Sequence, residues 1–259
     1  MKKVFIKNRK GQKLAIILQE AENSKGLVFV MHGLGGFKEQ PHIQVIADAF
    51  SKHQYDVVRF DTTNTLGESG GRYEDATITS YYADLEDVIK WATTQPWYRA
   101  PFILVGHSLG GICVGLYAEN HPEQVRALAP IATTVSGKLS FESKEDAGEL
   151  SKWRDTGWRE EISVSRPGVI KRLPWSHMED RLKYDLLPFA SRLAMPVLMV
   201  VGERDTDTSP NHQKILFNML PGPKEIHVIK GSEHSFRGPG HLQELGRFFS
   251  LWIDSLNQT

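Results

Sequence analysis

The chain has 259 residues, of which 40% are hydrophobic and 24% are charged. This composition is that of a globular protein, and it excludes a disordered or a collagen-like chain. Lysine plus arginine and aspartate plus glutamate number 31 each. Because nucleic acids and acidic membranes attract a basic excess, we expect neither of them as a partner.

The cysteine count and the N-terminal region bear on where the protein works. Cys113 is the single cysteine, which excludes an internal disulfide framework and is consistent with a reducing compartment. No stretch approaches the about 18 apolar residues of a membrane-spanning helix. The first apolar run stops at Lys7, whereas a signal peptide needs an apolar stretch of at least about 7 residues. We therefore expect a cytoplasmic protein with no stable membrane association.

Predicted strands and helices alternate along most of the chain. It begins with a hairpin, 4–6 and 14–18, around a polar turn. Short continuous apolar runs, typical of strands buried on both faces, then alternate with segments of helical spacing. Strands are expected at 27–31, 57–60, 102–105, 127–131, 196–201 and 225–229, and helices near 41–50, 81–92, 114–118 and 248–256. This alternation predicts an α/β fold with a mostly parallel sheet flanked by helices.

The alternation is interrupted from 136 to 190, where we find no clean buried strand. The segment is too short for a sizeable core of its own. We predict a cap, or lid, inserted at the carboxyl edge of the sheet within a single domain, 1–259. Three of the six tryptophans fall in it and are candidate substrate-binding residues, although for each one alone we favour a role in holding the cap together: Trp153, Trp158 and Trp175.

The strongest catalytic motif reads GHSLG at 106–110 and is followed by Gly111. It lies between a predicted strand and a predicted helix, which is the setting in which G-x-S-x-G marks a nucleophile. Such a tight turn strains the backbone of Ser108 and projects its hydroxyl above the sheet. The N–H of Leu109, at the start of the helix, can stabilise an oxyanion. The alternative is a glycine-rich turn whose serine only caps the helix.

A second glycine-rich loop, HGLGG at 32–36, directly follows the strand at 27–31. It lets the backbone approach a bound carbonyl group, and the N–H of Leu34 is the candidate second oxyanion donor. The alternative is an ordinary turn that uses glycine for positive φ. Its pairing with the serine turn favours the functional interpretation.

The acid and the base of a triad are expected after the last two strands. Asp205 ends a G-x-x-D pattern and is assigned to orient a histidine; Asp207 is the alternative acid, and Glu203 is expected to be solvated. Asp205 can also be read as an Asx-turn residue. His234 follows the last strand and lies downstream of Ser108 and Asp205, in the chain order of a known triad scaffold.

Nine other histidines are present in the chain. His32 and His107 are expected to be structural neighbours of the site. Five more, including His42, are expected on the surface or as satisfied core residues. The histidines and the lone cysteine show no zinc-ligand spacing, so no metal is predicted.

These motifs resemble those of α/β-hydrolase-fold serine esterases over nearly the whole chain: HGLGG at 32–36, GHSLGG at 106–111, GERDTDTSP at 202–210 and GSEHSF at 231–236. The chain looks most similar to bacterial cinnamoyl and feruloyl esterases and their monoacylglycerol-lipase-like relatives. The resemblance implies Ser108 as nucleophile, His234 as base and Asp205 as acid, with the Leu34 and Leu109 amides as oxyanion hole. Many relatives carry G-x-G-x-S after the third core strand, and only its end, 67–69, is kept here, which leaves the substrate subgroup open.

The expected activity is hydrolysis of small to medium esters, aromatic (hydroxycinnamoyl) or short-chain, through an acyl-enzyme and without a cofactor. The many charges of the cap argue against long-chain triglycerides. The expected partner is the small-molecule ester, and a homodimer is left open. The alternatives are thioester hydrolysis, acyl transfer or monoacylglycerol lipase activity on the same triad, and a non-catalytic binding module.

Overall fold

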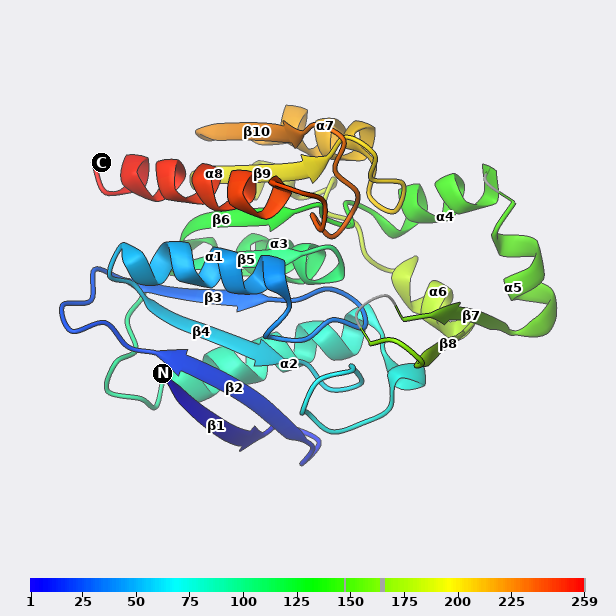
Figure 1. The fold of residues 1–259 in the computed structure, drawn as a ribbon, viewed down its shortest axis with the longest axis horizontal. Helices are drawn as coiled ribbons and strands as arrows, with labels where there is room; N and C mark the ends of the chain where they lie inside the picture. Colours follow the sequence, from blue (N-terminus) through cyan, green and yellow to red (C-terminus); the bar gives the residue numbers. More distant parts are fainter. Residues whose placement is uncertain (147, 164–165, 259) are drawn as a thin grey trace.

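A computed structural model describes residues 1–146, 148–163 and 166–258 of the chain (Figure 1). The strands are β1 (Lys2–Lys7), β2 (Lys13–Gln19), β3 (Leu27–Met31), β4 (Asp56–Asp61), β5 (Phe102–His107), β6 (Val125–Ile131), β7 (Trp158–Ile162), β8 (Ile170–Pro174), β9 (Val197–Gly202) and β10 (Lys224–Ile229). The helices are α1 (Pro41–Lys52), α2 (Ile78–Ala92), α3 (Leu109–Asn120), α4 (Gly137–Asp146), α5 (Leu150–Thr156), α6 (Ser176–Arg181), α7 (Pro210–Met219) and α8 (His241–Leu256). Short 3-10 helices are η1 (Tyr73–Asp75), η2 (Pro122–Gln124) and η3 (Ala190–Arg192).

Eight strands form the central sheet in the order β1-β2-β4-β3-β5-β6-β9-β10. Within this order, the six strands β4, β3, β5, β6, β9 and β10 are parallel to one another. The hairpin β1-β2 pairs antiparallel with β4 through β2. The strands β3, β5 and β9 are buried along their whole length, because helices cover both faces. The predicted mostly parallel sheet is confirmed.

Helices cover the sheet on both sides (Figure 1). On one face α1 and α8 lie against each other, and α8 buries Leu245, Phe249, Trp252 and Leu256 at helical spacing toward the sheet. On the other face α2, α3 and α7 pack over a second apolar cluster that contains Tyr81, Leu85 and Leu216. Burial of apolar surface is the dominant favourable contribution to folding, so these two clusters stabilise the fold more than any other feature.

The cap predicted at 136–190 contains α4, α5, α6 and the two-stranded sheet β7-β8; residues 147, 164 and 165 of this range lie outside the described residues. It lies at the end of the molecule to which the strand arrows of β3, β4 and β9 point (Figure 1). It is tied to the start of helix α2 by hydrogen bonds from α6: His177 Nδ1 lies 2.7 Å from the Ala76 carbonyl oxygen, and Asp180 accepts from the Thr79 N–H at 3.1 Å. The cap therefore sits over the carboxyl ends of the strands.

No helix was predicted from the sequence within the cap, and outside it one helix was missed, α7. Its start carries two signals: the Ser209 hydroxyl accepts a hydrogen bond from the His212 N–H at 3.4 Å, and Pro210 occupies the first turn. Within the described part of the chain no helix is both long and apolar enough to span a bilayer.

Candidate active site

Ser108 stands at the turn between β5 and α3 in a strained backbone conformation. Its φ of 56° and ψ of −117° are unfavourable for a residue with a Cβ atom. The strand and the helix come so close that a Cβ on Gly106 would lie 2.3 Å from the Gly110 carbonyl oxygen. A Cβ on Gly110 would lie 2.4 Å from the His32 carbonyl oxygen. The two glycines are therefore required for the turn, and the turn projects the Ser108 side chain beyond the sheet.

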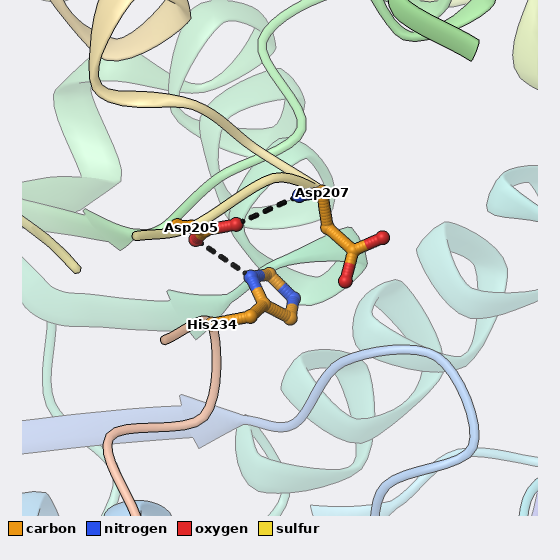
Figure 2. Close-up of side chains that lie close together, drawn as sticks. All are labelled: Asp205, Asp207 and His234. Carbon is orange, nitrogen blue, oxygen red and sulfur yellow. Dashed lines mark hydrogen bonds and ion pairs between the residues drawn. The ribbon is translucent and has the colours of Figure 1, made fainter. Parts of the chain in front are cut away.

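Ser108, His234 and Asp205 form one hydrogen-bonded row. Ser108 Oγ lies 2.8 Å from His234 Nε2, and His234 Nδ1 lies 2.8 Å from Asp205 Oδ2. The second of these contacts is drawn in Figure 2. The three residues come from the turn after β5, the loop after β9 and the loop after β10. The parallel sheet brings them together because the carboxyl ends of its strands meet at one edge.

Asp205 is held by its own loop. Its side chain is fully buried, and its Oδ1 accepts the N–H groups of Asp207 and Thr208, each at 2.9 Å. The Thr208 hydroxyl donates to Oδ2 at 2.8 Å. This Asx-type turn orients the carboxylate toward His234, so the turn role and the orienting role coexist in one residue.

Neither Asp207, the alternative acid, nor Glu203 is hydrogen-bonded to the imidazole in the described part of the chain. The Asp207 carboxylate is 54% exposed and forms an ion pair with Lys144 at 3.8 Å, and no hydrogen bond joins it to His234 (Figure 2). Glu203 is exposed and accepts the Gly231 N–H at 2.8 Å. Of the three candidates, Asp205 alone is hydrogen-bonded to the imidazole among the described residues.

The charges of the row are coupled. Burial by itself lowers the pKa of His234, but the hydrogen bond and the charge of Asp205 outweigh it, so that the pKa is raised above 6.5. Burial by itself raises the pKa of Asp205, and the contact with His234 outweighs it in turn, so that the pKa is lowered. The pair therefore favours an ionised carboxylate that stabilises a protonated imidazole.

Two further histidines adjoin the base. His107 Nε2 lies 2.9 Å from the His234 carbonyl oxygen, and the rings of His107 and His42 are 4.4 Å apart. Burial and the charge of His234 lower the pKa of His107 to about 3, and burial lowers that of His42 as well. The expected place of His107 beside the site is seen in the structure. His42 is buried, but it also borders the cavity over Ser108, and no sequence signal marked it.

The loop 33–36 lies against the nucleophile. A Cβ on Gly33 would lie 2.8 Å from the Ser108 Cβ, so only glycine allows this approach. Within the described residues, the N–H groups of Leu34 and Leu109 have no hydrogen-bond acceptor. Two free N–H donors beside a serine hydroxyl are what an oxyanion hole requires.

The cavity above Ser108 has a volume of about 450 Å³ and a polar lining. His234, Leu34 and Thr134 border it on the side of the sheet. Eight charged side chains surround it: Lys144, Arg159, Glu161, Lys171, Arg181, Asp207, Glu233 and Arg237. The cap thus turns charged groups, not aromatic ones, toward the nucleophile.

The three tryptophans predicted to bind substrate do not border this cavity. Trp153 and Trp175 pack edge to face with ring centroids 5.6 Å apart in the cap's own apolar cluster. Trp158 is 39% exposed, with the Arg172 guanidinium over its ring. The physical reason is that a cap this small needs its large apolar rings to form a core. Trp153 and Trp158 border a second cavity, on the cap itself.

Among the described residues, two clusters of acidic or histidine side chains have ligand atoms within 4.8 Å of one another, close enough to share a metal ion. In the cluster of Asp205, Asp207 and His234, both imidazole nitrogens already have hydrogen-bond partners. In the cluster of Glu39, Asp61 and Glu68, the buried ammonium of Lys38 contacts all three carboxylates, at 3.2, 2.8 and 2.6 Å. In both clusters the ligand atoms are already used within the protein.

Residues 22–161, more than half of the chain, match the Hydrolase_4 family, described as serine aminopeptidase S33. The chain belongs to this family of hydrolases. Residues 172–258 of this family member also match the family described as PhoPQ-activated pathogenicity-related protein. The predictions of a hydrolytic enzyme and of an α/β-hydrolase fold are confirmed.

Among curated proteins, this hydrolase is 27% identical over 213 residues to the mitochondrial palmitoyl-protein thioesterase ABHD10 of Bos taurus. The match covers 79% of this chain and 65%, slightly less than two thirds, of the relative. Among solved structures, Est1E from Butyrivibrio proteoclasticus with bound ferulic acid has a TM-score of 0.79 at 19% identity, with 99% of this chain and 100% of that chain covered. Mouse ABHD10 gives the same TM-score, identity and coverage. At this identity, the structural likeness concerns the fold.

Proposed function

We propose that this hydrolase is a serine carboxylic-ester hydrolase that works through Ser108, His234 and Asp205. The observation that carries the proposal is the continuous hydrogen-bonded row, 2.8 Å from Ser108 Oγ to His234 Nε2 and 2.8 Å from His234 Nδ1 to Asp205 Oδ2. A serine hydroxyl is a weak nucleophile at neutral pH and needs such an adjacent base.

The geometry supports the following course. Nε2 of His234 accepts the Ser108 proton while Oγ attacks the ester carbonyl carbon. The oxygen that becomes negative is stabilised by the Leu34 and Leu109 N–H groups. His234 then gives its proton to the leaving alcohol, and an acyl group stays on Ser108. Water, deprotonated by the same imidazole, releases the acid and restores the hydroxyl.

Asp205 has two tasks in this course. Its Oδ2 accepts a hydrogen bond from the Nδ1–H group, which leaves the lone pair on Nε2 directed at Ser108. Its negative charge stabilises the imidazolium that forms.

The cavity supports small to medium polar esters as substrates. Its volume of about 450 Å³ and its charged lining disfavour a long, bare acyl chain. Among esters of this size, hydroxycinnamoyl and short-chain acyl esters are the proposed classes.

Labelling with a fluorophosphonate probe tests the nucleophile directly. We expect wild-type protein to be modified at Ser108 and the Ser108→Ala variant to stay unmodified, as shown by mass spectrometry of the peptides. A folded wild-type protein that the probe does not modify would favour the alternative of a non-catalytic binding module.

Thioester hydrolysis is the second candidate, since a curated relative is named a palmitoyl-protein thioesterase. Both reactions, and acyl transfer or monoacylglycerol hydrolysis, share the acyl-enzyme. A panel of p-nitrophenyl esters, hydroxycinnamate esters, monoacylglycerols and acyl-thioesters, compared by kcat/KM, ranks them. Acyl transfer is distinguished by adding a second alcohol as acceptor.

The proposed location is the cytoplasm, and a homodimer is left open. The single cysteine favours the cytoplasm, while the curated relatives are named mitochondrial, so fractionation of the native cells decides. Light scattering of the purified protein decides between a monomer and a homodimer.

A further inference from the structure

The cavity over Ser108 carries more positive than negative side chains. Five cationic groups border it against three carboxylates: Lys144, Arg159, Lys171, Arg181 and Arg237 against Glu161, Asp207 and Glu233. These cations differ in whether they have an anionic partner within the protein.

Three of the cavity cations form ion pairs within the protein. Glu161 contacts both Arg159 and Lys171, one with each carboxylate oxygen. Lys144 pairs with Glu149 at 3.1 Å and with Asp207 at 3.8 Å. At the mouth formed by 233–237, the Glu233 carboxylate accepts the backbone N–H of Arg237 at 2.9 Å, and the Arg237 side chain is exposed, so water solvates its charge.

Arg181 is different. Within the described residues no carboxylate lies within 4 Å of its guanidinium, and its buried Nε has no hydrogen-bond partner. Its Nη2 lies 3.3 Å from His177 Nε2. His177 Nδ1 donates to the Ala76 carbonyl oxygen at 2.7 Å, which leaves Nε2 as a neutral acceptor. The contact positions the guanidinium without cancelling its charge.

Burial, followed by the charge of Arg159, lowers the pKa of Arg181 to about 10, so the side chain is still charged at neutral pH. The pKa of His177 is lowered to about 3 by burial and by Arg181, so the imidazole stays neutral. The Asp207 carboxylate acts on Arg181 only from beyond ion-pair distance. A partly buried guanidinium without an anionic partner is costly unless a ligand completes it.

We propose that Arg181, with Arg159 beside it, forms a subsite that binds a carboxylate group carried by the ester substrate. With Glu149, which pairs with Lys144, four carboxylates oppose the five cations, so one surplus positive charge remains. The planar guanidinium fork matches a carboxylate, and one surplus positive charge matches a singly charged group better than a phosphate dianion. The subsite deepens the proposed function and rests on it: the same molecule places its ester at Ser108 and its carboxylate at the cap.

The carboxylate can belong to the acyl part or to the alcohol part of the substrate, and two pairs of esters distinguish these. The first pair is the p-nitrophenyl half-ester of glutaric acid and the same ester with a terminal carboxamide. The second pair is p-carboxyphenyl butanoate and p-carbamoylphenyl butanoate. Within a pair, the ratio of kcat/KM measures the preference for the charged group.

For wild-type protein we expect a preference of about tenfold or more in one pair, because hydrogen bonds to charged groups are of that strength. Arg181→Gln should reduce that ratio about tenfold, and Arg181→Lys should keep part of it. Arg172→Gln is the matched control: this arginine lies on the β7-β8 hairpin that also carries Arg159, is 46% exposed and pairs with Glu160 away from the cavity. Its ratio should equal that of wild type.

Two failures are distinguishable. If wild-type protein is labelled at Ser108 and hydrolyses both members of each pair equally well, the subsite is refuted and the esterase proposal stands. If no ester is hydrolysed and Ser108 is not labelled, the esterase proposal fails, and calorimetry with glutarate decides the subsite separately. Binding that Arg181→Gln weakens about tenfold supports it, and no binding refutes it. Should Arg181→Gln not fold, Arg159→Gln takes its place in both measurements.

Discussion

The side chain of His107 contacts the backbone of His234: Nε2 lies 2.9 Å from the carbonyl oxygen. His107 directly precedes the nucleophile, so one short segment holds Ser108 and also positions its base. We expect His107→Phe, which fills the space but removes the donor, to lower kcat by about tenfold to a hundredfold, because a buried carbonyl is left unsatisfied. His107→Gln, which restores an N–H donor, should recover most of the activity. Equal activity of wild type and His107→Phe would contradict a positioning role.

The strained backbone of Ser108 can be separated from the loss of its hydroxyl. Ser108→Ala and Ser108→Gly should both lower ester turnover by several orders of magnitude. At a φ of 56°, however, glycine relieves strain that alanine keeps. We therefore expect the free energy of unfolding of Ser108→Gly to exceed that of Ser108→Ala by about 1 kcal/mol, measured by urea denaturation. A less stable glycine variant would speak against strain at this turn.

The same substitution, aspartate to asparagine, should lower kcat strongly at Asp205 and only slightly at Asp207. Asp205→Asn should lower kcat by about a thousandfold or more, because the amide no longer stabilises the imidazolium or fixes its tautomer. Asp207→Asn should leave kcat within about threefold, since its exposed carboxylate does not contact His234. The two kcat values with one p-nitrophenyl ester make the comparison. A severe loss in Asp207→Asn alone would transfer the acid role to that residue.

The pH dependence of kcat/KM follows from the charge of His234. Burial lowers the pKa of its imidazole and Asp205 raises it, and the net pKa lies above 6.5. Only the neutral imidazole accepts the Ser108 proton, so kcat/KM falls as the pH falls through this raised pKa. We expect the acidic limb of the profile above pH 6.5. A limb below that value would mean that burial outweighs Asp205.

The tryptophans of the cap test its packing. Trp153 is buried, and its Nε1 donates to the Leu173 carbonyl oxygen at 3.0 Å. Trp153→Ala should therefore lower the free energy of unfolding by about 3–5 kcal/mol. Trp158→Ala, at a 39% exposed position, should cost about 1 kcal/mol or less. Thermal melts measure both. Comparable losses would contradict the cap core described above.

Local patterns predicted the elements that build the sheet and the residues of the row. The continuous apolar runs of β3, β5 and β9 identified buried strands, because strands covered on both faces carry no polar alternation. The GHSLG turn marked Ser108 because few backbones other than a strand-to-helix elbow need that spacing of glycines. Helix α7 was missed although Ser209 and Pro210 mark its start, since its apolar periodicity is weak.

Identity and order of the reactive groups were thus present in the sequence by itself, because they depend on residue types and on their place after successive strands. The sequence assigned Asp205 but kept Asp207 as the alternative acid, and the tertiary structure showed which of them bonds the imidazole. The tertiary structure alone showed the approach of His107 and His42, the burial of Trp153 and the charged lining with its unpaired Arg181. The physical reason is distance along the chain: each depends on segments tens of residues apart whose meeting is set by the packing of the cap over the sheet, and no local pattern encodes such a contact.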